Sequence, residues 1–378
     1  MLHPGLYEQV INNALNRELS EVPEARKSTT PIDTAEASKV LAQYLTEVVQ
    51  KGLDNVQDNG GGIEAQIELA NQIVSTIQTT TKEPDFAALG VDQRAEQLLA
   101  LLRENDPRLA TGKAAKDIER PETSLAQSSL FTGAIHEPQM YTELKKEIVS
   151  ADHIDMLVSF IKWSGLRLLM DELRQFTQNG GELRIITTSY MGATDVKAIE
   201  ELRQLPNTKI KVSYDTKRTR LHAKTYVFYR DTGFTTAYVG SSNLSNAAIS
   251  SGLEWNVKVT QKDLPETIDK IAATFESYWN AGEFEYYDEG QRERLARALK
   301  AEKYSETHHG GIYTLDILPY SYQQEILDKL EAERAAIWWL LPPVPARRSS
   351  LRWTTSGSAN SIPESLAACC SWRIGKKS

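Results

Sequence analysis

The sequence predicts an α/β fold, in which a sheet flanked by helices is preceded by a small helical region. Two observations support this prediction. Apolar residues recur at helical spacing in several segments of residues 5–104, and from residue 137 onward short apolar runs of strand length alternate with helical segments. Such alternation is typical of a layered domain whose sheet is largely buried.

The predicted helical region covers residues 1–104. Its amphipathic segments span 5–19, 34–53, 62–80 and 92–104. Glycines 60–62 separate the second segment from the third as a loop. The polar, proline-containing segment 105–136 is interpreted as a linker.

Residues 137–284 form the predicted α/β domain. Its expected strands are short apolar runs at 154–161, 182–188, 209–213, 223–229, 236–239 and 254–259. Its expected helices lie at 165–178, 195–203 and 264–281. The charged segment 285–335 is interpreted as a second linker followed by the start of a further element.

Composition excludes several classes of protein. The chain has 378 residues, with 51 acidic and 43 basic side chains, a net charge of −8 and two cysteines, so it is not a disulfide scaffold. No apolar run reaches the roughly 18–20 residues of a membrane span, and the N-terminus lacks a signal-peptide pattern. We therefore expect a cytoplasmic protein that does not act at a membrane.

The residues with the clearest chemical meaning begin with His222 and Lys224. They stand two positions apart at the start of an expected strand, so their side chains project from the same face. The imidazole can act as a nucleophile or proton carrier, and the ammonium places a positive charge beside it.

A turn of residues 240–243 follows the next expected strand. Its backbone N–H groups, the hydroxyls of Ser241 and Ser242 and the amide of Asn243 suit the oxygens of a phosphate group. Glu254 opens the strand after that, where its carboxylate can accept a proton from the imidazole of His222 and set its tautomer.

These motifs resemble the signature of the phospholipase D superfamily, in which His-x-Lys is followed by an Asp and by a Gly-Ser turn that ends in Asn. One position departs from the pattern, because Tyr229 stands where the family has its mainly structural Asp, with Asp231 two residues later. The resemblance implies a phospholipase D-like sheet flanked by helices.

The resemblance also implies roles for individual residues. His222 would attack phosphorus and form a phosphohistidine, Lys224 and Asn243 would hold non-bridging oxygens, and Glu254 would orient His222. It implies that no metal and no cofactor is required. The family uses two such histidines and this chain has one motif, so a homodimer that supplies the second His-x-Lys motif is implied.

Four segments, at 159–165, 187–195, 213–228 and 240–256, look like the phospholipase D-like module found at the N-terminus of certain bacterial superfamily 2 DEAD/DEAH-box helicases. Residues 319–325 resemble the glutamine-bearing segment that precedes the phosphate-binding loop of the helicase motor. The loop itself, Gly-x-x-x-x-Gly-Lys-Ser/Thr, is absent from the sequence, so we expect no ATPase or helicase activity.

The composition changes abruptly near Ala336. Residues 337–378 contain four of the seven tryptophans, both cysteines, six basic residues and one acidic residue. Synonymous codons for residues 337–348, read in another frame, encode LVVAATGTGKT, which is a buried strand followed by a Walker-type loop. We interpret the chain as a truncated, frameshifted copy in which residues 336–378 are an out-of-frame, disordered tail. An evolved basic tail that binds nucleic acid is the alternative.

A basic stretch beside His222 indicates a polyanionic substrate. Its members are Lys209, Lys211, Lys217, Arg218, Arg220 and Lys224. Cations in this arrangement give sequence-independent affinity for the phosphates of nucleic acid, although an ordinary solvated strand and loop would show the same pattern. We therefore take Lys217, Arg218 and Arg220, with Ser241 and Ser242, as candidate substrate-binding residues. Trp163 and Trp255 could stack on bases, but both lie in or after apolar segments, and we expect them in the core.

The sequence thus leads to three functional hypotheses. The first is a metal-independent phosphodiesterase, a DNA nuclease derived from a helicase-nuclease of DNA repair or defence. The second is a non-catalytic DNA-binding module of a truncated DEAD/DEAH-box helicase. A phospholipid hydrolase or transferase is a weaker third hypothesis, because the sequence shows no clear amphipathic membrane face.

Overall fold

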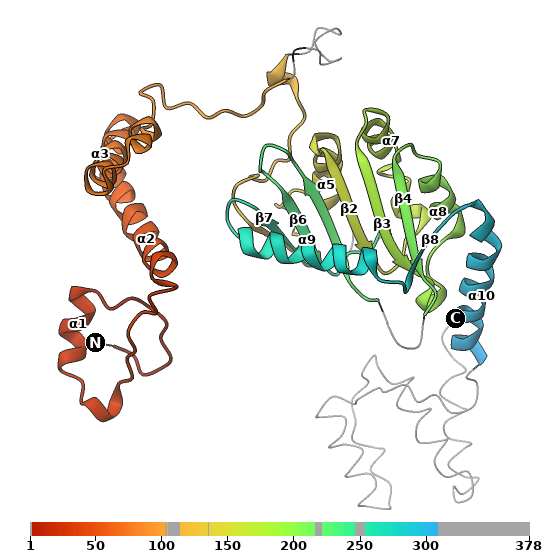
Figure 1. The fold of residues 1–378 in the computed structure, drawn as a ribbon, viewed down its shortest axis with the longest axis horizontal. Helices are drawn as coiled ribbons and strands as arrows, with labels where there is room; N and C mark the ends of the chain where they lie inside the picture. Colours follow the sequence, from red (N-terminus) through yellow and green to blue (C-terminus); the bar gives the residue numbers. More distant parts are fainter. Residues whose placement is uncertain are drawn as a thin grey trace, which may run out of the picture. The chain divides into compact units, whose positions relative to one another are not determined.

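The computed structural model describes residues 2–102, 104, 114–134, 136–215, 221–245 and 254–308. The chain divides into two compact units at the junction of Arg120 and Pro121 (Figure 1). Several sequence-based predictions lie outside the described residues, namely those for Lys217, Arg218, Arg220, the segment 319–325 and the tail 336–378.

The first unit is helical, as the sequence predicts. Its main helices are α1 (Asn13–Ser20), α2 (Ala37–Asp58) and α3 (Ile63–Thr81), and short 3₁₀ turns cover Glu24–Arg26, Pro84–Leu89 and Ala115–Asp117. α1 begins later than expected because the side chain of Asn12 caps it, accepting a hydrogen bond from the backbone N–H of Leu15 at 2.9 Å. The described part of the expected helix 92–104 is not helical, and Asp92 instead binds the backbone N–H of Arg94 at 2.9 Å in a local turn.

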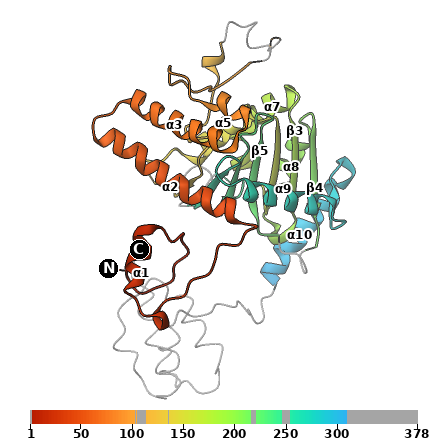
Figure 2. The same ribbon diagram turned by 60° about the vertical axis from the view of Figure 1, so that its left-hand side comes forward.

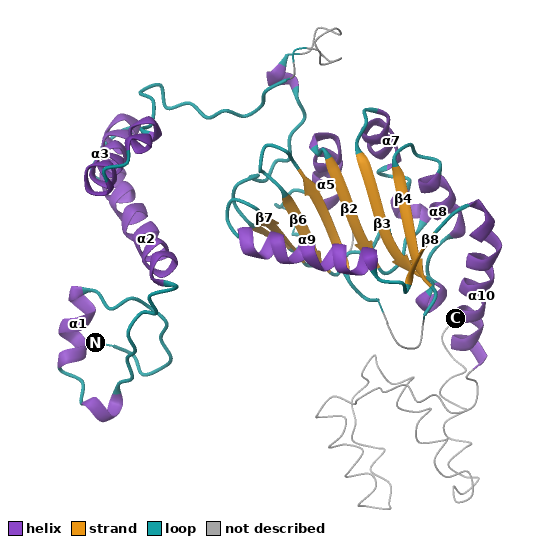
Figure 3. Cartoon of the chain, viewed as in Figure 1, coloured by secondary structure: helices purple, strands orange, loops and turns teal. Residues whose placement is uncertain are grey.

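An eight-stranded sheet organises the second unit, in the order β1-β7-β6-β5-β2-β3-β4-β8 (Figure 3, strands in orange). The strands are β1 (Ser129–Phe131), β2 (His153–Val158), β3 (Glu182–Thr188), β4 (Thr208–Ser213), β5 (Lys224–Tyr229), β6 (Thr236–Gly240), β7 (Asn256–Thr260) and β8 (Phe284–Tyr286). β2, β3 and β4 pair in parallel, and the other neighbours pair antiparallel. The predicted α/β arrangement is confirmed.

Helices cover both faces of this sheet (Figures 1 and 2). One face packs against α5 (Met140–Ser150), α7 (Met170–Gln178) and α8 (Val196–Arg203), with the one-turn helix α6 (Trp163–Leu166) after β2. The other face packs against α9 (Pro265–Asn280), whose Phe275 and Trp279 meet Leu157 and Ile186 of the sheet. Burial on both faces explains why the central strands are continuous apolar runs rather than alternating ones.

The sheet extends into two segments that the sequence suggested were linkers. β1 lies within residues 105–136 and pairs with β7, while β8 begins at Phe284, the last residue of the predicted domain, continues into 285–335 and pairs with β4. α10 (Arg292–His308) follows β8, and its Leu295 and Leu299, spaced at i and i+4, are buried in the main core. Both strands are only three residues long, which is too short for the alternation that identifies a strand in sequence.

A buried charge cluster joins α5 to side chains of β6 and β7 and to Arg230, which follows β5. The carboxylate of Glu147, on α5, lies 2.5 Å from Arg230 and 2.9 Å from Lys258, and all three side chains are buried. Thr236 and Tyr238 donate to the same carboxylate at 2.8 and 2.9 Å. Although burial raises the pKa of Glu147, the charges of Arg230 and Lys258 more than offset it, and the pKa is lowered from its usual 4.5.

Removing this carboxylate is expected to be strongly destabilising. Glu147→Ala leaves two buried cations without their partner and should lower the free energy of unfolding by about 3–5 kcal/mol in urea denaturation. Because the folded-state pKa of Glu147 is lowered, its contribution is present above about pH 4.5 and is lost as the pH falls further. Glu285→Gln, in an exposed ion pair with Arg294, is the matched control and should cost under about 1 kcal/mol. Equal effects of the two variants would contradict the assignment.

Candidate active site

The site begins where β5 enters the sheet. His222 is exposed just before this strand, whereas Lys224, its first residue, is 5% exposed. The structure brings the two side chains together, with Lys224 Nζ at 2.9 Å from His222 Nδ1 and 3.2 Å from Nε2. β5 lies between β6 and β2, so this end of the strand is fixed by neighbours on both sides.

The ammonium of Lys224 is poorly solvated. It donates to the backbone carbonyl of His222 at 2.7 Å, and burial lowers its pKa from the usual 10.5, with the charge of Glu254 acting in the opposite direction. A phosphate oxygen would offer this group a charge-assisted hydrogen bond that is stronger than the contacts it makes here. The pair therefore combines an accessible imidazole with a cation that lacks an anionic hydrogen-bond partner among the described residues.

The turn after β6 depends on a glycine. A Cβ atom at Gly240 would overlap the carbonyl oxygen of Trp255 and the side-chain oxygen of Asn256 on β7. The absence of a side chain lets the backbone of β6 approach β7 here, and the backbone N–H of Ser241 donates to the same Trp255 carbonyl at 3.1 Å. The turn is thus fixed to the sheet on its β7 side.

Ser242 is held inside this turn rather than presented to a substrate. It is fully buried, its hydroxyl accepts from Asn256 Nδ2 at 2.8 Å, and its carbonyl accepts from the hydroxyl of Tyr226 at 2.9 Å. Its backbone N–H also reaches Asn256 Oδ1, at 3.4 Å. The polar groups of Ser242 are therefore engaged in the fold, and its contact with a substrate remains a prediction.

Asn243 connects the turn to the segment that follows β2. Its Oδ1 accepts a hydrogen bond from the backbone N–H of Phe160 at 3.2 Å, and the side chain is 6% exposed. The next residue, Leu244, forms a parallel bridge with Ile161. Because the oxygen of the amide is occupied, its NH₂ group is the end that can donate to a phosphate oxygen.

Glu254 contacts the turn rather than the imidazole. Its carboxylate accepts a hydrogen bond from the hydroxyl of Ser241, and among the described residues no hydrogen bond joins it to His222. It does lie close enough to Lys224 to raise the pKa of that ammonium. The structure therefore brings Glu254, Ser241 and Lys224 into one electrostatic group, and the orienting contact with His222 remains a prediction.

Two members of the basic stretch have partners within the sheet unit. Lys209 forms an exposed ion pair with Glu182 at 2.8 Å. Lys211 is 7% exposed, and its ammonium donates to the carbonyl of Trp279 at the C-terminal end of α9. A cation at that end of a helix is stabilised by the last carbonyl groups. Of the described members of this run, Lys209 and Lys211 make contacts of the sheet unit, and Lys224 lies beside His222.

The position at which the superfamily has its Asp is occupied by the half-buried side chain of Tyr229. Burial raises the pKa of Tyr229, and hydrogen bonding to the buried Asp155 of β2 raises it further. Asp155 in turn receives two hydrogen bonds from Arg184, at 2.7 and 2.8 Å. A carboxylate is therefore present beside this position, on the neighbouring strand.

Sequence reasoning missed Asn256 and misplaced Trp255. Asn256 is 2% exposed at the start of β7, and a polar residue within the expected strand 254–259 could have marked it as a residue that holds the turn. Trp255 was expected in the core but is 63% exposed, so that prediction is wrong. Trp163 is half-buried against the main core, as expected.

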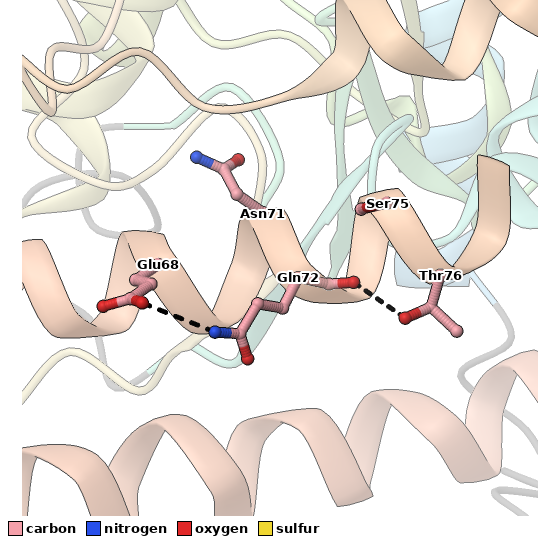
Figure 4. Close-up of a pocket in the computed structure, with 5 residues that line it drawn as sticks. All are labelled: Glu68, Asn71, Gln72, Ser75 and Thr76. Atoms are coloured by element: carbon pink, nitrogen blue, oxygen red, sulfur yellow. Dashed lines mark hydrogen bonds between the residues drawn. The ribbon is translucent and has the colours of Figure 1, made fainter. Parts of the chain in front are cut away.

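A hollow of about 590 Å³ lies in the helical unit, and it contains none of the candidate residues (Figure 4). Its lining comes from one helix, α3, and consists of Glu68, Asn71, Gln72, Ser75 and Thr76. Gln72 donates to Glu68, Thr76 donates to the carbonyl of Gln72, and Asn71 binds the backbone of Val91, so these groups are engaged in local contacts of the helical unit. Within the described residues no cluster of three or more His, Cys, Asp or Glu has the geometry of a metal site.

Comparison with known proteins finds a family model that matches the part of the chain that carries most of these residues. Residues 144–279 match the family model described as "Cardiolipin synthase, PLD-like domain". No curated protein matches the sequence. None of the helices that the structure describes has the length and hydropathy of a membrane-crossing segment.

Solved structures similar to the chain include two bacterial proteins. NucT from Helicobacter pylori is 22% identical, with a TM-score of 0.33, and the match covers 40% of this chain and 94% of NucT. Nuc from Salmonella typhimurium, a phospholipase D family member, is 20% identical, with a TM-score of 0.33, and the match covers 43% of this chain and 99% of Nuc.

The contacts of Asn256 predict a measurable role in stability. Asn256→Ala removes the partner of the buried N–H and hydroxyl of Ser242, so we expect a loss of about 1–3 kcal/mol in the free energy of unfolding. Asn280→Ala is the control, because that side chain makes one hydrogen bond, to the backbone of Glu276, at an exposed helix end. If Asn256→Ala lowered the free energy of unfolding no more than Asn280→Ala does, the hydrogen bonds between Asn256 and Ser242 would not hold the turn.

The electrostatic group predicts the direction of a pKa change. Because Glu254 raises and burial lowers the pKa of Lys224, Glu254→Gln should lower this pKa further below 10.5. The measurement is an NMR titration of the lysine side-chain resonances. Glu285→Gln should leave the Lys224 titration unchanged. An unchanged or higher pKa in Glu254→Gln would place Glu254 outside the electrostatic environment of Lys224.

Proposed function

We propose that this chain is a metal-independent phosphodiesterase that cleaves nucleic acid, and DNA in particular. The observation that carries the proposal is the contact of 2.9 Å between Lys224 Nζ and His222 Nδ1 in a phospholipase D-like domain, with the imidazole exposed and the ammonium buried. The description of the matching family concerns cardiolipin synthesis, so the choice of nucleic acid as substrate rests on the basic residues beside His222.

In the proposed reaction an imidazole nitrogen of His222 attacks the phosphorus of a phosphodiester. The bond from phosphorus to one ester oxygen breaks, and that oxygen leaves with a proton supplied by a second histidine. Lys224 and the NH₂ group of Asn243 hold the non-bridging oxygens, where negative charge increases in the transition state. Water then attacks the phosphohistidine, gives its proton to the second histidine, and releases His222.

The second histidine is proposed to come from a second copy of the chain. The sequence contains one His-x-Lys motif, so a two-fold dimer with a shared site would supply both histidines. Mixing provides a test of this part. A large excess of the His222→Asn variant should lower the activity of the wild-type chain, because mixed dimers contain only one reactive histidine.

Substitution of the nucleophile tests the reaction. His222→Asn should reduce the cleavage of single-stranded and duplex DNA in EDTA by at least about 10³-fold. His136→Asn, which changes an exposed histidine outside the site, should leave the rate unchanged. Wild-type chain that binds DNA but does not cleave it would instead support the non-catalytic DNA-binding module. Hydrolysis of phospholipid vesicles without cleavage of DNA would overturn the choice of substrate.

A further inference from the structure

Trp255 is the most exposed aromatic side chain among the described residues of the α/β unit, and none of its described contacts involves the indole ring. It is 63% exposed, immediately after Glu254 and immediately before β7. A large apolar side chain left in water loses the free energy that burial would provide. The indole is therefore available to a ligand.

The backbone that carries this indole is ordered. The carbonyl of Trp255 accepts from the N–H of Ser241 at 3.1 Å, which continues the β6–β7 pairing one residue beyond Gly240 and Asn256. The backbone of Trp255 is consequently fixed at the edge of the sheet, next to the start of β7. A fixed aromatic loses less conformational entropy on binding than one on a mobile loop.

An apolar strip continues from Trp255 along the sheet. In an extended chain, residues two apart share a face, so Val257 follows Trp255 on the same side. Its register neighbours are Val239 on β6 and Leu130 on β1. Their exposed fractions are 43% for Val257, 38% for Val239 and 46% for Leu130, so the strip is open to solvent.

The position of the strip favours nucleobases as its occupant. Adjacent residues of an extended chain point to opposite faces of a sheet. The carboxylate of Glu254 and the indole of Trp255 therefore lie on opposite faces, at the edge of the sheet where β7 begins. A nucleic-acid strand whose phosphate lies at Lys224 can cross this edge and place a flanking base on the indole. The strip itself consists of apolar side chains, and these suit the flat face of a base better than a phosphate.

We propose that Trp255 stacks on an unpaired base that flanks the phosphate bound at His222 and Lys224, which makes single-stranded nucleic acid the preferred substrate class. This inference rests on the proposed function, because it takes the phosphate position from that site. Bases in a duplex are stacked and paired within the helix, so the indole can reach them only after they have been unpaired. Val257, Val239 and Leu130 extend the apolar surface beside the stacked base.

The test compares four ligands in the His222→Asn background, which prevents cleavage during binding. The ligands are a single-stranded oligothymidylate, an abasic oligonucleotide of the same length, a blunt DNA duplex and phosphatidylglycerol vesicles. Trp255→Ala should weaken the affinity for oligothymidylate by roughly 5- to 100-fold and leave the affinities for the abasic strand and the duplex unchanged. Trp255→Phe should retain most of the affinity for oligothymidylate.

Other results would overturn the inference. An equal loss for the abasic strand would show that Trp255 acts through the fold, and an unchanged affinity for oligothymidylate would show that it does not stack. A loss of dimerisation in sedimentation, without a base-dependent loss of affinity, would assign the strip to a second copy, and a selective loss of vesicle binding would assign it to lipid. Base-dependent binding in a chain with no nuclease activity would retain this inference and refute only the catalytic proposal.

Discussion

The arrangement of the candidate site depends on the burial of one ammonium group. Lys224 is the first residue of a central strand, and its cation has little contact with water. Its hydrogen bonds go to the carbonyl and imidazole of His222, and Glu254 supplies the nearby negative charge. Such a cation is stabilised further by any anion that enters the site, so the cost of its burial favours the binding of a phosphate.

The rest of the α/β unit holds the three strands that carry this group. The groups of the candidate site all lie at one end of the sheet. His222 and Lys224 are at the start of β5, the Gly-Ser-Ser-Asn turn is at the end of β6, and Glu254 shortly precedes β7. At the other end the buried carboxylate of Glu147 binds Arg230, which follows β5, together with side chains of β6 and β7. The same strands thus make polar contacts both at the candidate site and farther along the sheet, and a shift of one strand would break several of them at once.

The sequence predicted most of this arrangement because two simple periodicities determine it. Apolar runs located the central strands, and spacing by two placed His222 beside Lys224. The short edge strands β1 and β8 were assigned to linkers, since three residues carry too little pattern. The burial of Ser242 and the exposure of Trp255 could not be predicted either. Both depend on which strand lies beside the turn, and that is a property of tertiary packing rather than of local sequence.

Tyr229 shows how the fold accommodates a departure from the superfamily pattern. The expected Asp would place a carboxylate at the end of β5, and this chain places Asp155 on the paired strand β2 instead. That carboxylate is neutralised by Arg184, which also binds Glu276 of α9 at 2.6 Å and lies over the rings of Phe275 and Trp279. Ionic contacts therefore still join the sheet to α9 in this region. Because Tyr229 ends β5 and Lys224 begins it, the contacts of Tyr229 do not involve the groups that the proposed chemistry uses.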